Sequence, residues 1–179
     1  MSNNPRILIT GGAGFIGTNF AHLIVEKYPN YEIVIVDKLN KQGRRENLKD
    51  IEDKIEFHHF DLIQEEKLRP IFEKGLDYIV HFAAETNVDR SIEDPDSFVS
   101  SNVVATNILL RMARDFKVKR FHHVSTDEVF GELSLDPNEK FNENTAYDPR
   151  SPYSATKAAS DHLVRAYAAT YGMHITISN

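Results

Sequence analysis

A glycine-rich segment near the start of the chain has the composition of a phosphate-binding turn. Gly11, Gly12, Gly14 and Gly17 come directly after the apolar run Arg6–Thr10 and open a segment of helical periodicity. The spacing satisfies two patterns at once, G-x-G-x-x-G and G-x-x-G-x-x-G. Glycine suits such a turn because the backbone must approach a pyrophosphate closely, and the following helix N-terminus presents free N–H groups to the phosphates. The segment therefore predicts a dinucleotide site.

An acidic residue stands where such a site needs one. Asp37 ends the second apolar run, Glu32–Asp37, 20 residues after Gly17. A carboxylate there can accept both hydroxyls of the adenosine ribose and repels a 2′-phosphate, which favours NAD over NADP. Four basic residues follow it, at Lys38, Lys41, Arg44 and Arg45. This basic stretch could hold a 2′-phosphate, or it could be a solvated loop.

A tyrosine and a lysine four residues apart could form an acid–base pair. Tyr153 and Lys157 fall on one face of a predicted helix that Ser151 can cap and Pro152 can open. A neighbouring ammonium and the charge of oxidised nicotinamide would lower the phenol pKa from its free value of about 10. The spacing alone also arises by chance. Its place after the fifth predicted strand, at the edge where ligands bind, favours the catalytic interpretation.

Two adjacent carboxylates follow that same strand. Asp127 and Glu128 come directly after Thr126. Carboxyl groups of different pKa can act as general acid and general base, although a helix cap or a solvated turn would explain the pair equally well. The preceding His122 and His123 are successive strand residues and point to opposite faces, so we expect core or wall positions and no metal site.

These residues need a parallel sheet to bring them together. Short runs rich in β-branched and aromatic residues alternate with segments of helical period, which is typical of an α/β fold with helices on both faces. We therefore predict a Rossmann-type, doubly wound parallel sheet of about six strands. The expected strands are Arg6–Thr10, Glu32–Asp37, Ile55–Phe60, Tyr78–Phe82, Arg120–Ser125 and His174–Ser178.

Two helices are expected to cover this sheet, and one long loop to lie near its ligand edge. The first helix should use Phe15, Phe20, Leu23 and Ile24. The later helix should use Val103, Ile108, Leu109 and Met112. Residues 131–150, with several Asn, Asp and Pro and little periodicity, read as a surface loop.

Size and composition fit one soluble domain over residues 1–179. The chain is 41% apolar and 27% charged, has a net charge of −6, and contains no cysteine. No apolar run approaches the roughly 18 residues of a membrane span, and no basic field attracts nucleic acid. The polar start lacks the features of a secretory signal, and no disulfide or thiolate metal site can form. We expect a cytoplasmic protein with neither a nucleic-acid nor a membrane partner.

Four motifs together resemble the extended short-chain dehydrogenase/reductase family, and within it the dTDP-glucose 4,6-dehydratases. They are Thr10–Gly17, His81–Ile92, Ser125–Gly131 and Tyr153–Asp161. Of these motifs, the triplet Thr126-Asp127-Glu128 best distinguishes the dehydratases from related enzymes, because epimerases and decarboxylases of the family usually lack the Asp-Glu pair. UDP-glucose 4,6-dehydratases share the triplet, so a dTDP or a UDP sugar could be the substrate.

The resemblance implies an activity and a role for each catalytic residue. The activity is dehydration of a nucleoside-diphosphate glucose to the 4-keto-6-deoxy sugar, by oxidation at C4, loss of water across C5–C6 and hydride return to C6. Tyr153 would take the proton of the 4-hydroxyl, Lys157 would lower the tyrosine pKa, and Thr126 would bind the 4-oxygen. Glu128 would remove the C5 proton while Asp127 protonates the departing 6-hydroxyl.

The resemblance also implies the ligand contacts and the assembly. Thr86 would face the substrate, and a homodimer would form through the helices over Asn102–Arg114 and Tyr153–Tyr171. The C-terminal substrate lobe of the family is expected to be missing, so an NAD-binding remnant without turnover is an alternative, as is a UDP-sugar 4-epimerase. The expected NAD contacts are Gly11, Gly14, Phe15, Ile16, Gly17, Asp37, Lys38, Asp61, Leu62, Ala83, Ala84, Ser101, Tyr153 and Lys157.

Overall fold

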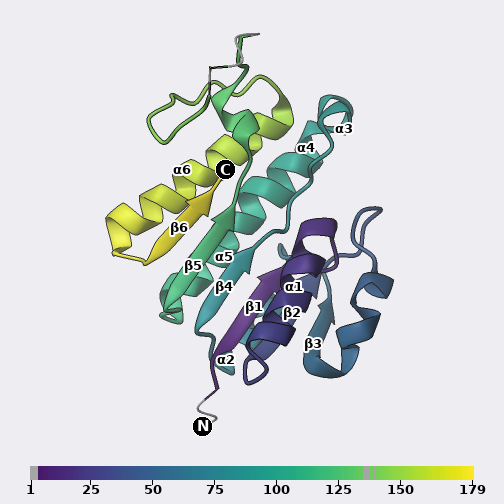
Figure 1. Ribbon diagram of the computed structural model, residues 1–179. Coiled ribbons are helices and arrows are strands. Elements are labelled where there is room, and N and C mark those ends of the chain that lie inside the picture. Colours follow the sequence, from purple (N-terminus) through teal and green to yellow (C-terminus); the bar gives the residue numbers. More distant parts are fainter. Residues whose placement is uncertain (1–3, 135–137, 139) are drawn as a thin grey trace.

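The protein is a parallel α/β sheet in a computed structural model that describes residues 4–134, 138 and 140–179. Within these residues, six strands follow the order β3-β2-β1-β4-β5-β6 (Figure 1). The strands are β1 (Arg6–Thr10), β2 (Glu32–Asp37), β3 (Ile55–His59), β4 (Tyr78–His81), β5 (Arg120–Val124) and β6 (Ile175–Ser178). β1 and β2 have the predicted bounds, and each other strand is one residue shorter at one end. Because the strand order reverses between β1 and β4, a crevice opens at their carboxyl ends.

Helices connect the strands on both faces of the sheet. They are α1 (Phe15–Lys27), η1 (Arg45–Lys54), α2 (Glu65–Glu73), α3 (Val88–Glu93), α4 (Pro95–Phe98), η2 (Val99–Val104), α5 (Ala105–Asp115), η3 (Asp127–Phe130) and α6 (Pro152–Tyr171). The stretch from α4 through the π-helical η2 to α5 is continuous, since the junction residues keep right-handed helical dihedrals. A π-helical stretch inside a helix is frequent at functional sites.

The alternation of side chains along the strands divides the core into two layers. Leu8 and Val34 pack with residues of α2, α5 and α6, whereas Ile7 and Ile33 pack with residues of α1 and η1. Successive strand residues point to opposite faces, so apolar residues in unbroken series bury both sides of the sheet. This two-sided packing confirms the predicted doubly wound fold. It also holds the strands in place, and with them the residues at their carboxyl ends.

The prediction for the buried face of α1 was partly wrong. Phe15 is 83% exposed and Leu23 is 52% exposed, and Phe20 is only partly buried. Instead the buried side of α1 consists of Gly17, Ala21, Ile24 and Val25. The phase of the helix follows from Gly17, which must lie against the glycine turn and so brings the residues four, seven and eight positions later toward the sheet.

The later helices follow their predicted patterns more closely. On α5, Leu109 and Met112 are buried. The N-terminus of α6 has the expected cap: Ser151 accepts a hydrogen bond from the backbone of Ser154, and Pro152 occupies the first turn. Gly172 ends α6 in the left-handed region, where glycine is favoured. The cap matters for function because it fixes the start of the helix that carries Tyr153 and Lys157.

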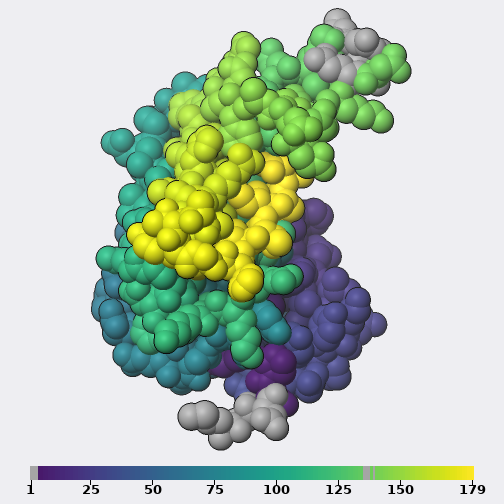
Figure 2. Space-filling view, turned by 90° about the vertical axis from the view of Figure 1, so that its left-hand side faces the viewer, coloured from purple at the N-terminus to yellow at the C-terminus, as the bar shows by residue number. Residues whose placement is uncertain are grey.

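The segment after η3 lies beyond the ligand edge of the sheet. Residues 135–137 and 139 of the predicted loop 131–150 lie outside the described residues, and its described part contains no helix or strand. This segment, green at the top of Figure 2, projects above α6 and β6. Phe130 contacts both Phe141 and Tyr147 through their rings, so an aromatic cluster fastens it to η3. Among the described residues, no helix is long and apolar enough to cross a membrane.

Candidate functional site

A cleft of about 320 Å³ lies at the carboxyl ends of the strands around the β1–β4 switch point. Every residue predicted to contact NAD lines it, and so does Thr86, the predicted substrate contact. The sequence reasoning missed several further lining residues, which are Val36, Asn40, Gln42, Gly43, Phe60, Phe82, Ala105, Val124 and Ser125. Four of them, Val36, Phe60, Phe82 and Ser125, directly neighbour predicted site residues at the ends of strands, so the topology of the sheet could have pointed to these four.

The glycine turn has the shape that a pyrophosphate cradle requires. Gly11 has a φ of +69°, and a Cβ there would lie 2.6 Å from the backbone nitrogen of Ala83. A Cβ on Gly17 would overlap the carbonyl oxygen of Gly11. Any side chain at these two positions would therefore force the turn away from β4 or from α1. The crowding explains why both positions hold glycine.

The N-terminus of α1 is open toward an anion. Gly14 caps the helix without a side-chain hydrogen bond, and the first turn contains no acidic residue. The first N–H groups of a helix have no partner inside it, and they carry the positive end of the helix dipole. Phe15 and Ile16, which begin the helix, line the cleft. The residues present thus fit the diphosphate of a dinucleotide.

Asp37 is held rigidly at the end of β2. Its carboxylate accepts hydrogen bonds from the backbone nitrogens of Ala13, at 3.0 Å, and Leu39, at 2.8 Å. The carboxylate lies in the cleft wall, and Gly43 packs so closely that a Cβ there would lie 2.8 Å from one of its oxygens. A preorganised carboxylate at this place fits the two hydroxyls of an adenosine ribose.

The basic stretch after Asp37 is divided between the cleft and the solvent. Lys38 lines the cleft, but its ammonium lies 2.6 Å from Glu85 and donates to Ser101. Lys41 and Arg44 are exposed, and Arg45 forms a surface ion pair. Three of the four basic side chains therefore match the solvated loop that the sequence left as one alternative.

Lys157 is buried at the end of β5. It is 3% exposed, and its Nζ donates a 2.8 Å hydrogen bond to the carbonyl of Val124. Burial lowers the pKa of Lys157 to about 8, and the charge of Asp161 opposes this shift. The side chain therefore remains mostly protonated at neutral pH, in an environment that lets it lose its proton more easily than a free lysine.

The expected lowering of the Tyr153 pKa is not what this structure shows. Burial raises the pKa of the Tyr153 hydroxyl, a hydrogen bond with Thr126 lowers it, and the charge of Glu128 raises it further. The net direction is upward. The physical reason is that the phenol is largely buried, while the ammonium of Lys157 is bound to the carbonyl of Val124. A lower value needs a further positive charge beside the phenol.

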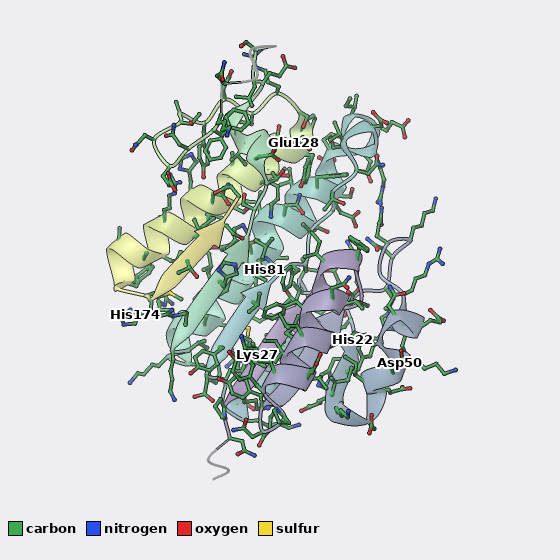
Figure 3. The ribbon with its side chains drawn as sticks, viewed as in Figure 1. His22, Lys27, Asp50, His81, Glu128 and His174 are labelled. Atoms are coloured by element: carbon green, nitrogen blue, oxygen red, sulfur yellow. The ribbon has the colours of Figure 1, made fainter. Side chains whose placement is uncertain are left out.

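Thr126 and the carboxylate pair lie beside Tyr153 but do not line the cleft. Thr126 caps η3 by accepting a hydrogen bond from the backbone of Glu128, and Asp127 and Glu128 are exposed within that helix. Burial, followed by the neighbouring charge of Asp127, raises the pKa of Glu128. Figure 3 labels Glu128 near the start of α6, beyond the carboxyl ends of the strands, and His81 within the sheet. The turn therefore forms a helix cap, as one alternative predicted, and it also places Thr126 and the carboxylate pair beside Tyr153.

Two buried residues that support the site had no predicted role. His81 bridges the hydroxyls of Thr10 and Thr106, at 2.7 and 2.9 Å, and so ties β1 and β4 to α5. Asp161, one turn beyond Lys157, gathers hydrogen bonds from the end of β5 and the following loop. The sequence signals were a histidine in an apolar strand and a carboxylate on the buried face of a helix. Among the described residues, no group of three His, Asp or Glu side chains could hold a metal ion.

The fold and the cleft define a Rossmann-fold protein with the tyrosine–lysine pair of a short-chain dehydrogenase at its ligand edge. A family model described as GDP-mannose 4,6 dehydratase matches residues 8–179. The chain belongs to that family.

Individual relatives agree with the narrower resemblance. The chain is 47% identical to a dTDP-glucose 4,6-dehydratase of Mycobacterium tuberculosis over 97% of its own length and 52% of the relative. A crystal structure of a dTDP-glucose 4,6-dehydratase from Streptomyces venezuelae, with NAD bound, superposes with a TM-score of 0.88 and 41% identity, and covers 96% of this chain and 54% of that one. The resemblance to these enzymes is confirmed, and the chain spans about half the length of the curated relatives it matches.

A crystal structure of another enzyme shares the fold equally well. The UDP-glucose 4-epimerase of Thermotoga maritima, with UDP-glucose, superposes with a TM-score of 0.86 at 29% identity, and covers 96% of this chain and 54% of that one. The backbone alone therefore does not separate a dehydratase from an epimerase, so the distinction has to come from side chains.

Proposed function

We propose that this chain binds NAD in the cleft and provides the catalytic residues for 4,6-dehydration of a nucleoside-diphosphate glucose, with dTDP-glucose as the substrate. One observation carries the proposal: the cleft joins the glycine turn and Asp37 to Tyr153 and Lys157, and Thr126 of the carboxylate-bearing turn lies beside Tyr153. The higher identity to dTDP-glucose 4,6-dehydratases than to epimerases supports it.

The cofactor would be held by residues at both ends of the cleft. The glycine turn would receive the diphosphate, Asp37 would bind the adenosine ribose, and Lys157 would bind the nicotinamide ribose. NAD bound here supplies a hydride acceptor for C4 oxidation and then a hydride donor for C6. The oxidation state is restored in each cycle, so the cofactor need not leave.

Tyr153, Thr126 and Lys157 would manage the proton of the sugar 4-hydroxyl. Tyr153 accepts this proton as the carbonyl forms at C4, and Thr126, which lies beside the phenol, is placed to bind the same oxygen. The raised pKa of Tyr153 means that the phenolate forms only when positive charge is added nearby. The positive nicotinamide ring of the bound cofactor would provide that charge, in addition to Lys157.

The carboxylate pair would carry out the elimination. The carbonyl at C4 acidifies the C5 proton, which Glu128 removes, while Asp127 gives a proton to the departing 6-hydroxyl so that water leaves. The raised pKa of Glu128 makes it a stronger base than an ordinary glutamate. The carboxylate pair also distinguishes a dehydratase from an epimerase, because an epimerase eliminates no water and needs no acid and base for that step.

A second candidate function is NAD binding without turnover. One observation favours it: Asp127 and Glu128 are exposed and do not line the cleft. A general acid or base has to lie within hydrogen-bonding reach of the proton that it transfers, so carboxylates that stay outside the cleft would leave NAD bound without turnover.

The test is to incubate the chain with NAD and dTDP-glucose and to analyse the nucleotide sugar by mass spectrometry. The proposal predicts a product lighter by one water, which Glu128→Gln reduces by at least about a hundredfold. A sugar of unchanged mass with inverted C4 would identify an epimerase. Unchanged substrate, with NAD binding demonstrated by calorimetry, would establish the binding-only function.

We also propose a homodimer formed through α5 and α6. Val104, the last residue of η2 directly before α5, and Tyr171, at the end of α6, are 44% and 50% exposed, which leaves apolar surface at the ends of these helices. Light scattering coupled to size exclusion would report twice the chain mass. The single NAD-binding domain over residues 1–179 and the cytoplasmic location remain predictions from the sequence.

A further inference from the structure

Glu85 is a buried carboxylate beside the cleft whose function is not explained by catalysis. It is 3% exposed and follows β4 on the far side of the switch point from Asp37. Asn102 of η2 fixes its backbone, accepting from the Glu85 nitrogen at 2.8 Å and donating to its carbonyl at 3.0 Å. Burying a carboxylate is costly unless it is paired, so its partners indicate its role.

The partners of Glu85 come from both sides of the cleft. The Lys38 ammonium lies 2.6 Å from one carboxylate oxygen, and Arg90 of α3 lies 3.0 Å from the other. Asn40 donates to the first oxygen at 3.3 Å. Because Lys38 and Asn40 belong to the loop after β2, this carboxylate joins that loop to the segment after β4. Ser101 also accepts a hydrogen bond from Lys38, at 2.8 Å.

The position of Lys38 makes this pairing important for the choice of cofactor. Among the described residues that line the cleft, the cations are Lys38 and Lys157, and Lys157 lies at the other end with Tyr153. Lys38 directly follows Asp37, the expected ribose ligand. It is therefore the cleft cation that could compensate the charge of a 2′-phosphate, but Glu85 holds it at 2.6 Å, with Asp61 as a more distant partner at 3.9 Å.

We propose that Glu85 is a specificity-determining positioning residue: by holding the Lys38 ammonium, it keeps the cleft selective for NAD over its 2′-phosphorylated form. The inference rests on the proposed NAD site. Asp37 repels a 2′-phosphate directly, and Glu85 adds to this by withholding the cation that could offset the repulsion. Specificity is a difference of two affinities, and this arrangement penalises the competing ligand.

The experiment measures dissociation constants for NAD and NADP by calorimetry, with the intact chain and its variants. Glu85→Gln keeps the shape of the side chain but removes its charge, so Lys38 retains only the longer ion pair with Asp61 and can pair with a 2′-phosphate. The NADP-to-NAD ratio of dissociation constants should fall about tenfold, because a charge-assisted contact is gained by one ligand only. The double variant Lys38→Met/Glu85→Gln should have the same ratio of dissociation constants as Lys38→Met alone, because it has no ammonium left to release. Glu93→Gln, which removes an exposed charge of α3, should not change it.

Several outcomes would overturn the inference. Equal weakening of NAD and NADP binding in Glu85→Gln would show a structural role only, and a gain that survives in the Lys38→Met background would show a long-range charge effect. If circular dichroism shows that Glu85→Gln does not fold, Glu85→Asp decides: it keeps the charge but draws it back from Lys38, and the ratio should fall about threefold. An unchanged ratio in Glu85→Asp contradicts the inference. A chain that binds neither dinucleotide would refute the proposed NAD site itself.

Discussion

The hydroxyl of Ser125 donates a 2.7 Å hydrogen bond to the buried carboxylate of Asp161. This bond ties the end of β5, from which Thr126 follows, to the helix that carries Tyr153 and Lys157. The same carboxylate oxygen accepts a bond from the hydroxyl of Tyr147, at 2.9 Å, so the loop after η3 is fastened to the same point. The other oxygen lies 3.3 Å from His123. The turn that carries Thr126, Asp127 and Glu128 is thus held in place by the side chain of Asp161.

Asp161→Asn should destabilise the protein and loosen this turn. The amide oxygen can still accept from Ser125 and Tyr147, but both bonds lose the strength of a charged acceptor, at a cost of about 2 kcal/mol in the free energy of unfolding. Urea denaturation at pH 7 measures the change. Asp50→Asn, at an exposed position, is the matched control and should stay within about 0.5 kcal/mol of the parent chain. Equal effects of the two substitutions would contradict the role of Asp161.

The pH dependence of that loss has a defined sign. Burial acts to raise the pKa of Asp161, but the close approach of His123 and the hydrogen bonds from Ser125 and Tyr147 lower it below its ordinary value overall. A carboxyl group whose folded-state pKa is lowered stabilises the fold above its unfolded pKa of about 3.9, and this contribution disappears as the pH falls through the folded value. The stability difference between parent and Asp161→Asn should therefore shrink in acid.

Lys157→Met should change the response of stability to alkaline pH. The pKa of the buried ammonium is about 8, against about 10.4 in an unfolded chain, so its burial costs about 3 kcal/mol while both states are protonated. Between about pH 8 and about pH 10.4, Lys157 is neutral in the folded protein but still protonated in the unfolded chain. Rising pH therefore removes the free-energy cost of burying the charged lysine. Urea denaturation at pH 7.5 and pH 10 should show the parent gaining about 2 kcal/mol relative to Lys157→Met, because the unfolded lysine is not yet fully deprotonated at pH 10. Parallel curves would mean that the lysine titrates normally.

Gly11→Ala should abolish NAD binding. The new Cβ would meet the backbone of Ala83 in a conformation that favours glycine, so the cradle would have to open. Gly75→Ala is a matched control because Gly75 also has a positive φ, of +89°, but has no atom near the added Cβ. It should cost about 1 kcal/mol of stability and leave NAD binding intact. Calorimetric titration of NAD into both variants gives the comparison, and unimpaired binding by Gly11→Ala would exclude the turn as the phosphate site.

Turnover should require a deprotonated Glu128 of unusually high pKa. Burial and the charge of Asp127 raise the pKa of Glu128, so the acid limb of the kcat/KM profile should lie above the ordinary glutamate value of about 4.3. Asp127→Asn removes the neighbouring charge and should move that limb to lower pH. The profile is measured from product formation between pH 4 and pH 8. A limb that does not respond to Asp127→Asn would assign it to another group.

Local patterns predicted most of the fold and the cofactor end of the site. The glycine turn and Asp37 are fixed by neighbouring strands and helix caps, whose signals are short-range in sequence. The exposure of Phe15 was mispredicted because hydrophobic periodicity does not show that Gly17 must approach Gly11, which sets the phase of α1. A contact between backbone atoms leaves no hydrophobic signature.

Long-range pairings explain what the sequence did not predict about the chemistry. Glu85 meets Lys38, and Asp161 meets Ser125, although the partners lie 47 and 36 positions apart in the sequence and only the folded sheet brings them together. The direction of the Tyr153 pKa shift depends on burial, which spacing to Lys157 cannot reveal. Charge balance inside the cleft is thus a property of the assembled fold.

The most direct test of the account follows hydrogen at C5 of the sugar. In deuterated water, with NAD and dTDP-glucose, removal of the C5 proton by Glu128 and later reprotonation from solvent should place one deuterium at C5 of the dehydrated product, while C6 receives the hydride from C4. Mass spectrometry and proton NMR of the product locate that deuterium. A converted sugar that retains its original hydrogen at C5 would contradict the proposed dehydratase chemistry.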